Sequence, residues 1–338
     1  MKKTLIAFTV FATCVGLFSS CSEGTENIPA TKPNTFKAGL KKIEPEKIVI
    51  EYHEGHSHLP LDEDDPKNDS KNDAGDLGDV FWSRSGQNSG FHANPDSRVA
   101  KFPHHTIQFM ELFRQADGSY QISSEGTDAI RMITSLGKGG KWHAFIVQLF
   151  DKEGNRMDLD LRKPEMQDRV QVFWHVSDIH PLYNGAPAKK NIRPEEAFFF
   201  MYFDREKDNS SKVLRNPLGF RGVVKAQEPY VKYNVTLTLT ILPEGKSKGS
   251  LQNSVSPTQE QLGAMALQIT FPCRNITYGL SDRLPSDATE KDWEADDQRY
   301  YADLSKEYSA YTPKQIEELQ TTLDLLPIEG AGGSQFWL

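Results

Sequence analysis

The sequence predicts a mainly β protein, made of two antiparallel β-sandwich-like modules followed by a C-terminal helical segment. Short segments rich in Val, Ile, Phe, Tyr and Thr recur along the chain, and several alternate apolar with polar side chains at the period of a strand. Gly, Pro, Asn and Asp separate these segments at short intervals, which favours sandwiches over a parallel α/β sheet. Amphipathic helical periodicity is concentrated near the C-terminus.

The first module opens with "KIVIEYH", in which Ile48, Ile50 and Tyr52 share one face of a strand. Two further strand-like segments, "HTIQFMELF" and "YQIS", flank the dipeptide Asp117–Gly118, which is typical of tight hairpins. The segment "KWHAFIVQLFDKEGNRMDLDL" then predicts a strand, a turn at 152–155 and a second strand.

The second module is predicted by the strand-like segments "RVQVFWHVSD", "EEAFFFMYFD", "LGFRGVVK", "YNVTLTLTILPEG" and "GAMALQITFP". Each half of the chain holds an aromatic-rich strand that ends in Asp, a basic residue and Glu, as in "WHAFIVQLFDKEGN" and "AFFFMYFDREKDN". This similarity suggests a duplication. We therefore expect β modules over residues 45–163 and 164–275.

The C-terminal segment, 276–338, is expected to be partly helical. "KDWEADDQRYYADLSKEY" predicts one helix, and "YTPKQIEELQTTLDLLP" predicts another. In the second helix Thr312 is the predicted N-cap, Pro313 occupies the first helical position, and Gln315 completes a capping box. Its apolar stripe consists of Ile316, Leu319, Leu323 and Leu326.

The N-terminus carries a targeting signal. Lys2 and Lys3 precede the apolar run "TLIAFTVFATCVGLF", which is too short to require a membrane-spanning helix, and "LFSSC" ends at Cys21. These features resemble the signal peptide and lipobox of bacterial lipoproteins. The resemblance implies cleavage of residues 1–20 and lipidation of Cys21, which would anchor the protein in the outer membrane, facing the periplasm or the cell surface. Polar residues 21–44 are expected to form a flexible tether.

Composition limits the classes of partner and chemistry. The net charge of −8 and the lack of a basic stripe disfavour nucleic-acid binding. Cys273 follows a strand-like segment with no local His or acid to activate it, so we expect a buried, inert thiol. The sequence has no G-x-S-x-G, H-E-x-x-H, P-loop or G-x-G-x-x-G motif, so we expect a binding protein and not an enzyme.

The segment "EYHEGHSHLP" is the strongest candidate site. His56 and His58 are two residues apart, so in an extended chain their imidazoles point to the same face and can hold one ion. His53 lies across the flexible Gly55, and His92 in "SGFHANP" is a further candidate. Imidazole suits zinc and other transition metals, and it also serves as an axial ligand of haem. The plainer interpretation is a polar loop with its histidines in solvent.

Other polar and aromatic residues are interpreted more plainly. The acid-rich run 62–79 fits no calcium-loop register, so we expect a solvated insertion. His143 and His175 lie within aromatic strands and are expected to be buried or half-buried. Trp82, Trp142 and Trp174 are expected in the core, although exposed tryptophans would suit a sugar ligand.

One enzyme family shares two short motifs with this chain. "SDIH" resembles the first metal motif of calcineurin-like phosphoesterases and "GHSH" resembles their last, which would make ligands of Asp178, His180, His56 and His58. The order of the two motifs is reversed here, however, and the family's GNHE motif is absent. The resemblance therefore gives only a minor alternative, a metallophosphoesterase-like hydrolase.

The sequence resembles the His-bearing surface lipoproteins of Bacteroidetes in its lipobox, in its "EGHSH" and "FHANP" elements and in its β-rich organisation. Those lipoproteins are associated with TonB-dependent transport. The resemblance implies a membrane-anchored binding protein that captures a transition-metal ion or haem for outer-membrane uptake, with a TonB-dependent transporter as partner. The alternative is a carbohydrate-binding or adhesion lipoprotein that uses exposed tryptophans.

Overall fold

The computed structural model describes residues 42–58, 90–93, 107–124, 126–134, 141–202, 204, 214, 216–248, 257–280 and 283–318, with the backbone alone at 55–58, 90–93, 107, 141 and 142. The predicted signal peptide, the lipidation site Cys21, most of the tether and the acid-rich run 62–79 lie outside the described residues. The same holds for Trp82.

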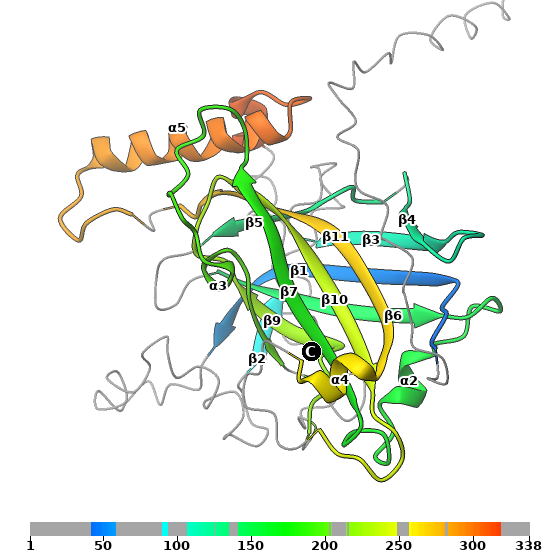
Figure 1. Ribbon diagram of the computed structural model, residues 1–338. Coiled ribbons are helices and arrows are strands. Elements are labelled where there is room, and N and C mark those ends of the chain that lie inside the picture. Colours follow the sequence, from blue (N-terminus) through cyan, green and yellow to red (C-terminus); the bar gives the residue numbers. More distant parts are fainter. Residues whose placement is uncertain are drawn as a thin grey trace, which may run out of the picture.

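The first sheet has seven strands in the order β4-β3-β1-β6-β9-β8, with β2 paired to β1, and all its pairs are antiparallel. β1, blue in Figure 1, runs through the middle of this sheet and pairs with β3 on one side and β6 on the other. The strands are β1 (Lys47–His58), β2 (Gly90–Ala93), β3 (Ile107–Arg114), β4 (Tyr120–Ile122), β6 (Lys141–Phe150), β8 (Phe199–Tyr202) and β9 (Arg221–Lys225).

The second sheet has four strands in the order β5-β11-β10-β7. Its strands cross those of the first sheet obliquely in Figure 1. β5 is parallel to β11, and the other two pairs are antiparallel. The strands are β5 (Ile130–Thr134), β7 (Val170–Pro181), β10 (Val231–Ile241) and β11 (Met265–Tyr278).

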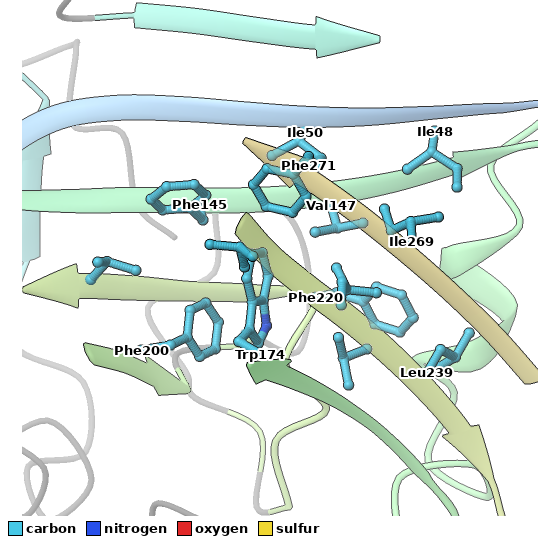
Figure 2. Close-up of a cluster of buried hydrophobic side chains, with 14 of the residues drawn as sticks. Ile48, Ile50, Phe145, Val147, Trp174, Phe200, Phe220, Leu239, Ile269 and Phe271 are labelled. Carbon is cyan, nitrogen blue, oxygen red and sulfur yellow. The ribbon is translucent and has the colours of Figure 1, made fainter. Parts of the chain in front are cut away.

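The core lies between the two sheets. Figure 2 shows Ile50 and Phe145 of the first sheet facing Phe271 of the second, with Trp174 packed beside Phe200. The rings of Trp174 and Phe200 are stacked with centroids 4.4 Å apart. Trp174 is buried, as the sequence predicts. Burial of such aromatic side chains is the main stabilising contribution of a sandwich of this kind.

Each sheet takes strands from both sides of residue 163. β8 and β9 come from later in the chain but complete the first sheet, whereas β5 comes from earlier and lies in the second. One continuous cluster of buried side chains spans both sheets. The boundary expected between modules at 163 and 164 therefore does not coincide with a division between the sheets. Pairing between distant strands decides the arrangement, and local sequence patterns do not encode it.

Both predicted turns are present, but only the first is followed by the predicted strand. Gly118 has a φ of 82° in the turn between β3 and β4, as Asp117–Gly118 predicts. The strand expected after the turn at 152–155 is wrong: one bridge joins Phe150 to Arg156, and the short helix α2 (Asp158–Leu161) follows. The buried carboxylate of Asp158 accepts a hydrogen bond from the Leu149 N–H (3.1 Å), which holds this helix against β6.

The predicted C-terminal helices are present in the described residues. α5 (Glu290–Glu307), orange in Figure 1, lies at one end of the sandwich beside β11. Residues 313–318 are helical, and the Thr312–Gln315 capping box forms as predicted, with Thr312 N–H donating to Gln315 Oε1 at 2.9 Å. The remaining short helices are α3 (Pro194–Ala197) and α4 (Gln259–Gly263). None of the described helices is long and apolar enough to cross a bilayer.

Candidate functional site

The end of β1 divides the predicted ligand positions between two faces of the first sheet. Side chains alternate along a strand, so positions 52, 54, 56 and 58 belong to one face and positions 51, 53, 55 and 57 to the other. Tyr52 and Glu54 are buried, 0% and 1% exposed, and Ile48 and Ile50 on the same face belong to the core between the sheets. The face that carries position 56 is thus the continuation of the core-facing side of β1.

β2 brings His92 to this face. In the antiparallel pair of β1 and β2, His56 is the register partner of His92, and His58 is the partner of Gly90. Directly opposed residues of an antiparallel pair occupy the same face of a sheet, with Cβ atoms about 5 Å apart. Three of the four predicted ligands, His56, His58 and His92, therefore occupy neighbouring positions on one face. On the β6 side, the partner of His56 is Lys141.

His53 takes the opposite face. β1 continues through Gly55 in unbroken register with β6, so the chain does not fold His53 back toward position 56. The His53 side chain is 5% exposed, and its Nε2 lies 2.6 Å from Glu51 Oε1, a neighbour on its own face. The sheet therefore separates His53 from the other three positions.

Two residues that the sequence did not identify as ligands lie next to this group. Glu54 is the direct register partner of His143 on β6, and both side chains are buried (1% and 0% exposed). His143 Nδ1 lies 2.8 Å from the hydroxyl of Tyr52, and the two rings are stacked with centroids 5.5 Å apart. The sequence did contain one signal: Glu54 shares its face with the apolar positions 48 and 50, and an acid at a core-facing position of a strand is unusual.

The electrostatics of this region are set by burial and by one carboxylate. Burial raises the pKa of Tyr52 well above its ordinary value, and the negative charge of Glu54 raises it further. Burial also raises the pKa of Tyr308 at the end of α5, where Arg131 opposes the shift and Glu54 adds to it. Both phenols therefore stay neutral at physiological pH. When Glu54 is ionised, its charge gives the interior beside them a negative potential, which favours a cation.

Within the part of the chain whose side chains are described, no group of three His, Cys, Asp or Glu side chains lies close enough together to hold a metal ion. The described side chains include those of Glu54 and His143 but not those at positions 56, 58 and 92.

The other candidate residues lie away from this face. Cys273 is buried in β11 of the second sheet, and burial raises the pKa of its thiol, which confirms the predicted buried residue. Asp178 and His180 are exposed residues of β7, also in the second sheet. The interpretation of His175 as buried or half-buried is wrong, because it is exposed on the outer face of β7. His143, by contrast, is buried as predicted.

Comparison with protein-family models, with curated proteins and with solved structures gives no match for this chain.

Proposed function

We propose that this protein is a membrane-anchored binding lipoprotein that captures a transition-metal ion, or haem through an axial histidine, for uptake across the outer membrane. The observation that carries the proposal is the register of β1 and β2, which sets His56 directly opposite His92 and leaves His58 two residues further along the same face. Three imidazole-bearing positions on one face of a sheet are a ligand set typical of transition-metal sites.

The buried neighbours of these positions support the proposal. The buried carboxyl group of Glu54 lies two residues before position 56 on the same face, and when ionised its charge favours a bound cation. Burial also lowers the effective dielectric constant around a bound ion, which strengthens its attraction to an anionic group.

The proposed location rests on the N-terminal sequence. Lipidation of Cys21 would hold the folded part at the outer membrane through the tether, near a TonB-dependent transporter that receives the ligand. Replacing Cys21 with Ala should move the protein from the detergent phase to the aqueous phase in a detergent phase-separation assay. A Cys21→Ala variant that still enters the detergent phase would exclude this anchor.

The proposal assigns capture and not catalysis. The phosphoesterase alternative needs Asp178 and His180 beside His56 and His58, but the first pair lies in β7 of the second sheet and the second pair in β1 of the first.

The carbohydrate alternative needs exposed tryptophans. Trp174 is buried, and Trp293 on α5 is 45% exposed.

A ligand titration tests the proposal. The full chain, purified in detergent and freed of metal with a chelator, is titrated with Zn²⁺, Cu²⁺, Fe²⁺ and haemin. We expect at least one of these ligands to bind with a dissociation constant below about 1 µM, the range that corresponds to about −8 kcal/mol. A variant with both His56→Ala and His92→Ala should lose that binding. His175→Ala, an exposed histidine of the other sheet, is the matched control.

Failure of all four ligands to bind, or equal binding by the double variant, would reject the proposal. A wild-type chain that binds glycans on an array, with no loss in the histidine variant, would favour the carbohydrate alternative.

The pH dependence of binding provides a further check. Only neutral imidazole ligates a metal, and the ordinary imidazole pKa is about 6.5. Affinity for Zn²⁺ should therefore be steady at neutral pH and fall as the pH drops below about 6.5. Affinity that does not change between pH 7.5 and pH 5 would contradict ligation by histidine.

A further inference from the structure

The start of α5 projects from the sandwich. Every residue from Glu290 to Ala295 is exposed, and the buried residues of α5 begin at Asp296. Figure 1 shows the paler, N-terminal end of α5 extending away from the two sheets. An α-helix rises 1.5 Å per residue, so roughly 10 Å of helix precedes the part that packs on the second sheet. These first turns therefore offer a helical surface to a partner.

The projecting turns are kept in order from both ends. The hydroxyl and the N–H of Thr289 donate to Asp292 Oδ2, at 2.6 and 2.8 Å, in a capping box. At the other end of the helix, Arg131 Nε and Arg274 Nη1 each donate to Glu307 Oε1 at 2.8 Å. A short helix without tertiary packing is only marginally stable in water, so the cap and the anchor matter. An ordered surface loses less conformational entropy when it binds.

One face of these turns combines an indole ring with three carboxylates. Glu290, Trp293, Glu294 and Asp297 are spaced three or four residues apart, so they lie side by side along the helix, and we call them the Trp293 face. Trp293 is 45% exposed, and the three acids are exposed as well. Within the described part of the chain, none of the three carboxylates has an ion pair or a side-chain hydrogen bond. Their charges are therefore available to a partner.

The chemistry of the Trp293 face defines what would fit it. Tryptophan is among the residues most enriched at the energetic centres of protein interfaces, where its ring fills an apolar pocket of the partner. Carboxylates around such a ring attract Lys and Arg side chains at the rim of that pocket, which speeds and orients the encounter. The complementary surface is thus an apolar pocket with a basic rim.

Charge disfavours the other classes of occupant. Membrane surfaces and nucleic acids are anionic, and helices that lie on membranes carry Lys and Arg on their polar side. A symmetric contact between two copies of this chain would set the same acids against each other, and the net charge of −8 adds to the repulsion. A basic protein surface is the occupant that charge complementarity favours.

We propose that the Trp293 face is a docking surface for a protein partner that presents Lys and Arg side chains around an apolar pocket for the indole ring. The proposal goes beyond the proposed function, because it does not depend on which ligand the protein captures. It assigns α5 a role in assembly.

Fluorescence quenching of the purified full chain tests the charge of the Trp293 face. The emission of Trp293 is the difference between a chain and its Trp293→Phe counterpart. Iodide is repelled by carboxylates, so replacing the three acids should raise the iodide quenching constant of Trp293 by at least about twofold. The triple variant consists of Glu290→Gln, Glu294→Gln and Asp297→Asn. Quenching by neutral acrylamide should not change. Iodide quenching that is the same before and after the replacement would overturn the proposal.

Photo-crosslinking in cells that produce the full chain tests the partner. A photoreactive benzoylphenylalanine replaces Trp293, and in the control it replaces Phe113, whose ring on β3 is 40% exposed. We expect position 293 to crosslink to one protein, with the attached peptide, mapped by mass spectrometry, rich in Lys and Arg. The triple variant should lower the yield at least about fivefold, and so should an increase in salt from 50 to 300 mM, because screening weakens the attraction.

A second triple variant controls for the loss of net charge. It removes three exposed carboxylates of the sandwich by Glu153→Gln, Glu165→Gln and Glu244→Gln. Its yield at position 293 should stay within about twofold of the chain with all its acids. Far-UV circular dichroism checks that both triple variants are folded.

Several results would overturn the proposal. These are a yield at position 293 no higher than at position 113, a yield that the two triple variants lower equally, and attachment to lipid, to polysaccharide, to a second copy or to residues 319–338 of the same chain. Capture of a protein whose attached surface lacks Lys and Arg would overturn it too. All of these results are independent of metal or haem binding, so the proposed function is tested separately.

Discussion

Asp204 illustrates how a single buried residue organises the chain around it. Its carboxylate accepts four backbone hydrogen bonds, from the N–H groups of Leu218, Gly219, Phe220 and Arg221, at 2.6 to 3.1 Å. Gly219 is required within this loop, because it has a φ of 92° and an added Cβ would lie 2.7 Å from the carbonyl oxygen of Val172. The loop leads into β9, so these hydrogen bonds help to position β9 between β6 and β8 in the first sheet.

Asp204→Ala should therefore be strongly destabilising. The substitution leaves four backbone donors without their acceptor, and we expect the free energy of unfolding to fall by more than about 3 kcal/mol. Urea unfolding followed by tryptophan fluorescence measures the change. Asp151→Ala, in the exposed turn after β6, removes a similar local carboxylate and should have a much smaller effect. Equal losses in the two variants would contradict the organising role of Asp204.

Glu196 provides a prediction for pH dependence. The N–H of Arg193 and the side chains of Lys189 and Arg193 donate to its carboxylate, and these bonds lower its pKa to about 2. A carboxyl with a lowered folded-state pKa contributes stability above its unfolded pKa of about 4.3, and this contribution is lost as the pH falls toward the folded value.

Glu196→Gln should accordingly be less stable than the wild type at pH 7. The two stability curves should converge as the pH falls from about 4.5 to about 2, as measured by thermal unfolding across that range. Glu195→Gln is the neighbouring control, because the half-exposed Glu195 carboxylate forms an ion pair with the exposed side chain of Arg193 (3.1 Å). A difference between wild type and Glu196→Gln that persists unchanged at pH 2 would contradict this assignment.

At the scale of elements, α5 is attached to the second sheet through a buried polar contact. The Tyr230 hydroxyl donates to Asp303 Oδ2 at 2.7 Å, and Thr277 Oγ1 donates to the same oxygen at 2.9 Å. Tyr230 adopts a φ of 61°, an unusual value for a bulky residue, which its surroundings must stabilise. Apolar packing of Tyr300 and Leu304 against Ile133 and Ile276 completes the attachment.

Tyr230→Phe should loosen α5 without unfolding the sandwich. Loss of the hydroxyl leaves the Asp303 carboxylate with a weaker set of donors, and we expect a loss of about 1 to 3 kcal/mol in stability. Faster amide hydrogen exchange confined to 290–307 would locate the effect. Tyr183→Phe, which removes an exposed contact with Lys306, is the control and should change stability by less than about 0.5 kcal/mol. Exchange that stays as slow as in the wild type would contradict the role of the contact.

Elements with strong local signals were predictable from the sequence, and those that depend on distant partners were not. Asp117–Gly118 predicted the hairpin, and Thr312 with Gln315 predicted a helix start, because turn and cap chemistry is local. The segment at 156–161 looked like a strand, but the salt bridge from Arg156 and the hydrogen bond from Leu149 hold Asp158 at the start of a helix. The prediction that His175 is buried or half-buried was wrong because β7 has one face in solvent and position 175 lies on that face.

The candidate site was predictable only in part, for the same reason. The spacing of His56 and His58 showed that both belong to one face of a strand, but only the pairing of β1 with β2 places His92 opposite His56. Glu54 and His143 come together across β1 and β6, which are distant in sequence. His53 was expected to support the site because Gly55 is flexible, yet continuous pairing with β6 keeps that glycine extended.

At the scale of the whole molecule, the two sheets share one core and should unfold together. Phe271 of β11 is fully buried and faces the first sheet in Figure 2. Phe271→Ala should lower the stability of the chain by about 3 to 5 kcal/mol in a single cooperative transition. Phe113→Ala, at a ring that is 40% exposed, is the control, with an expected loss below about 1 kcal/mol. Two separate transitions, with one unaffected by Phe271→Ala, would contradict the shared core.

The most direct test of the central claim, that β1 and β2 bring His56 and His92 to one ligand site, is a double-mutant cycle of Zn²⁺ affinity. The wild type, His56→Ala, His92→Ala and the double variant are titrated at pH 7.5 under identical conditions. Ligands of one ion are coupled, so each single change should weaken binding by at least about tenfold and the double change should cost clearly less than the sum of the two. Additive effects, or single variants that bind Zn²⁺ as tightly as the wild type, would contradict the account.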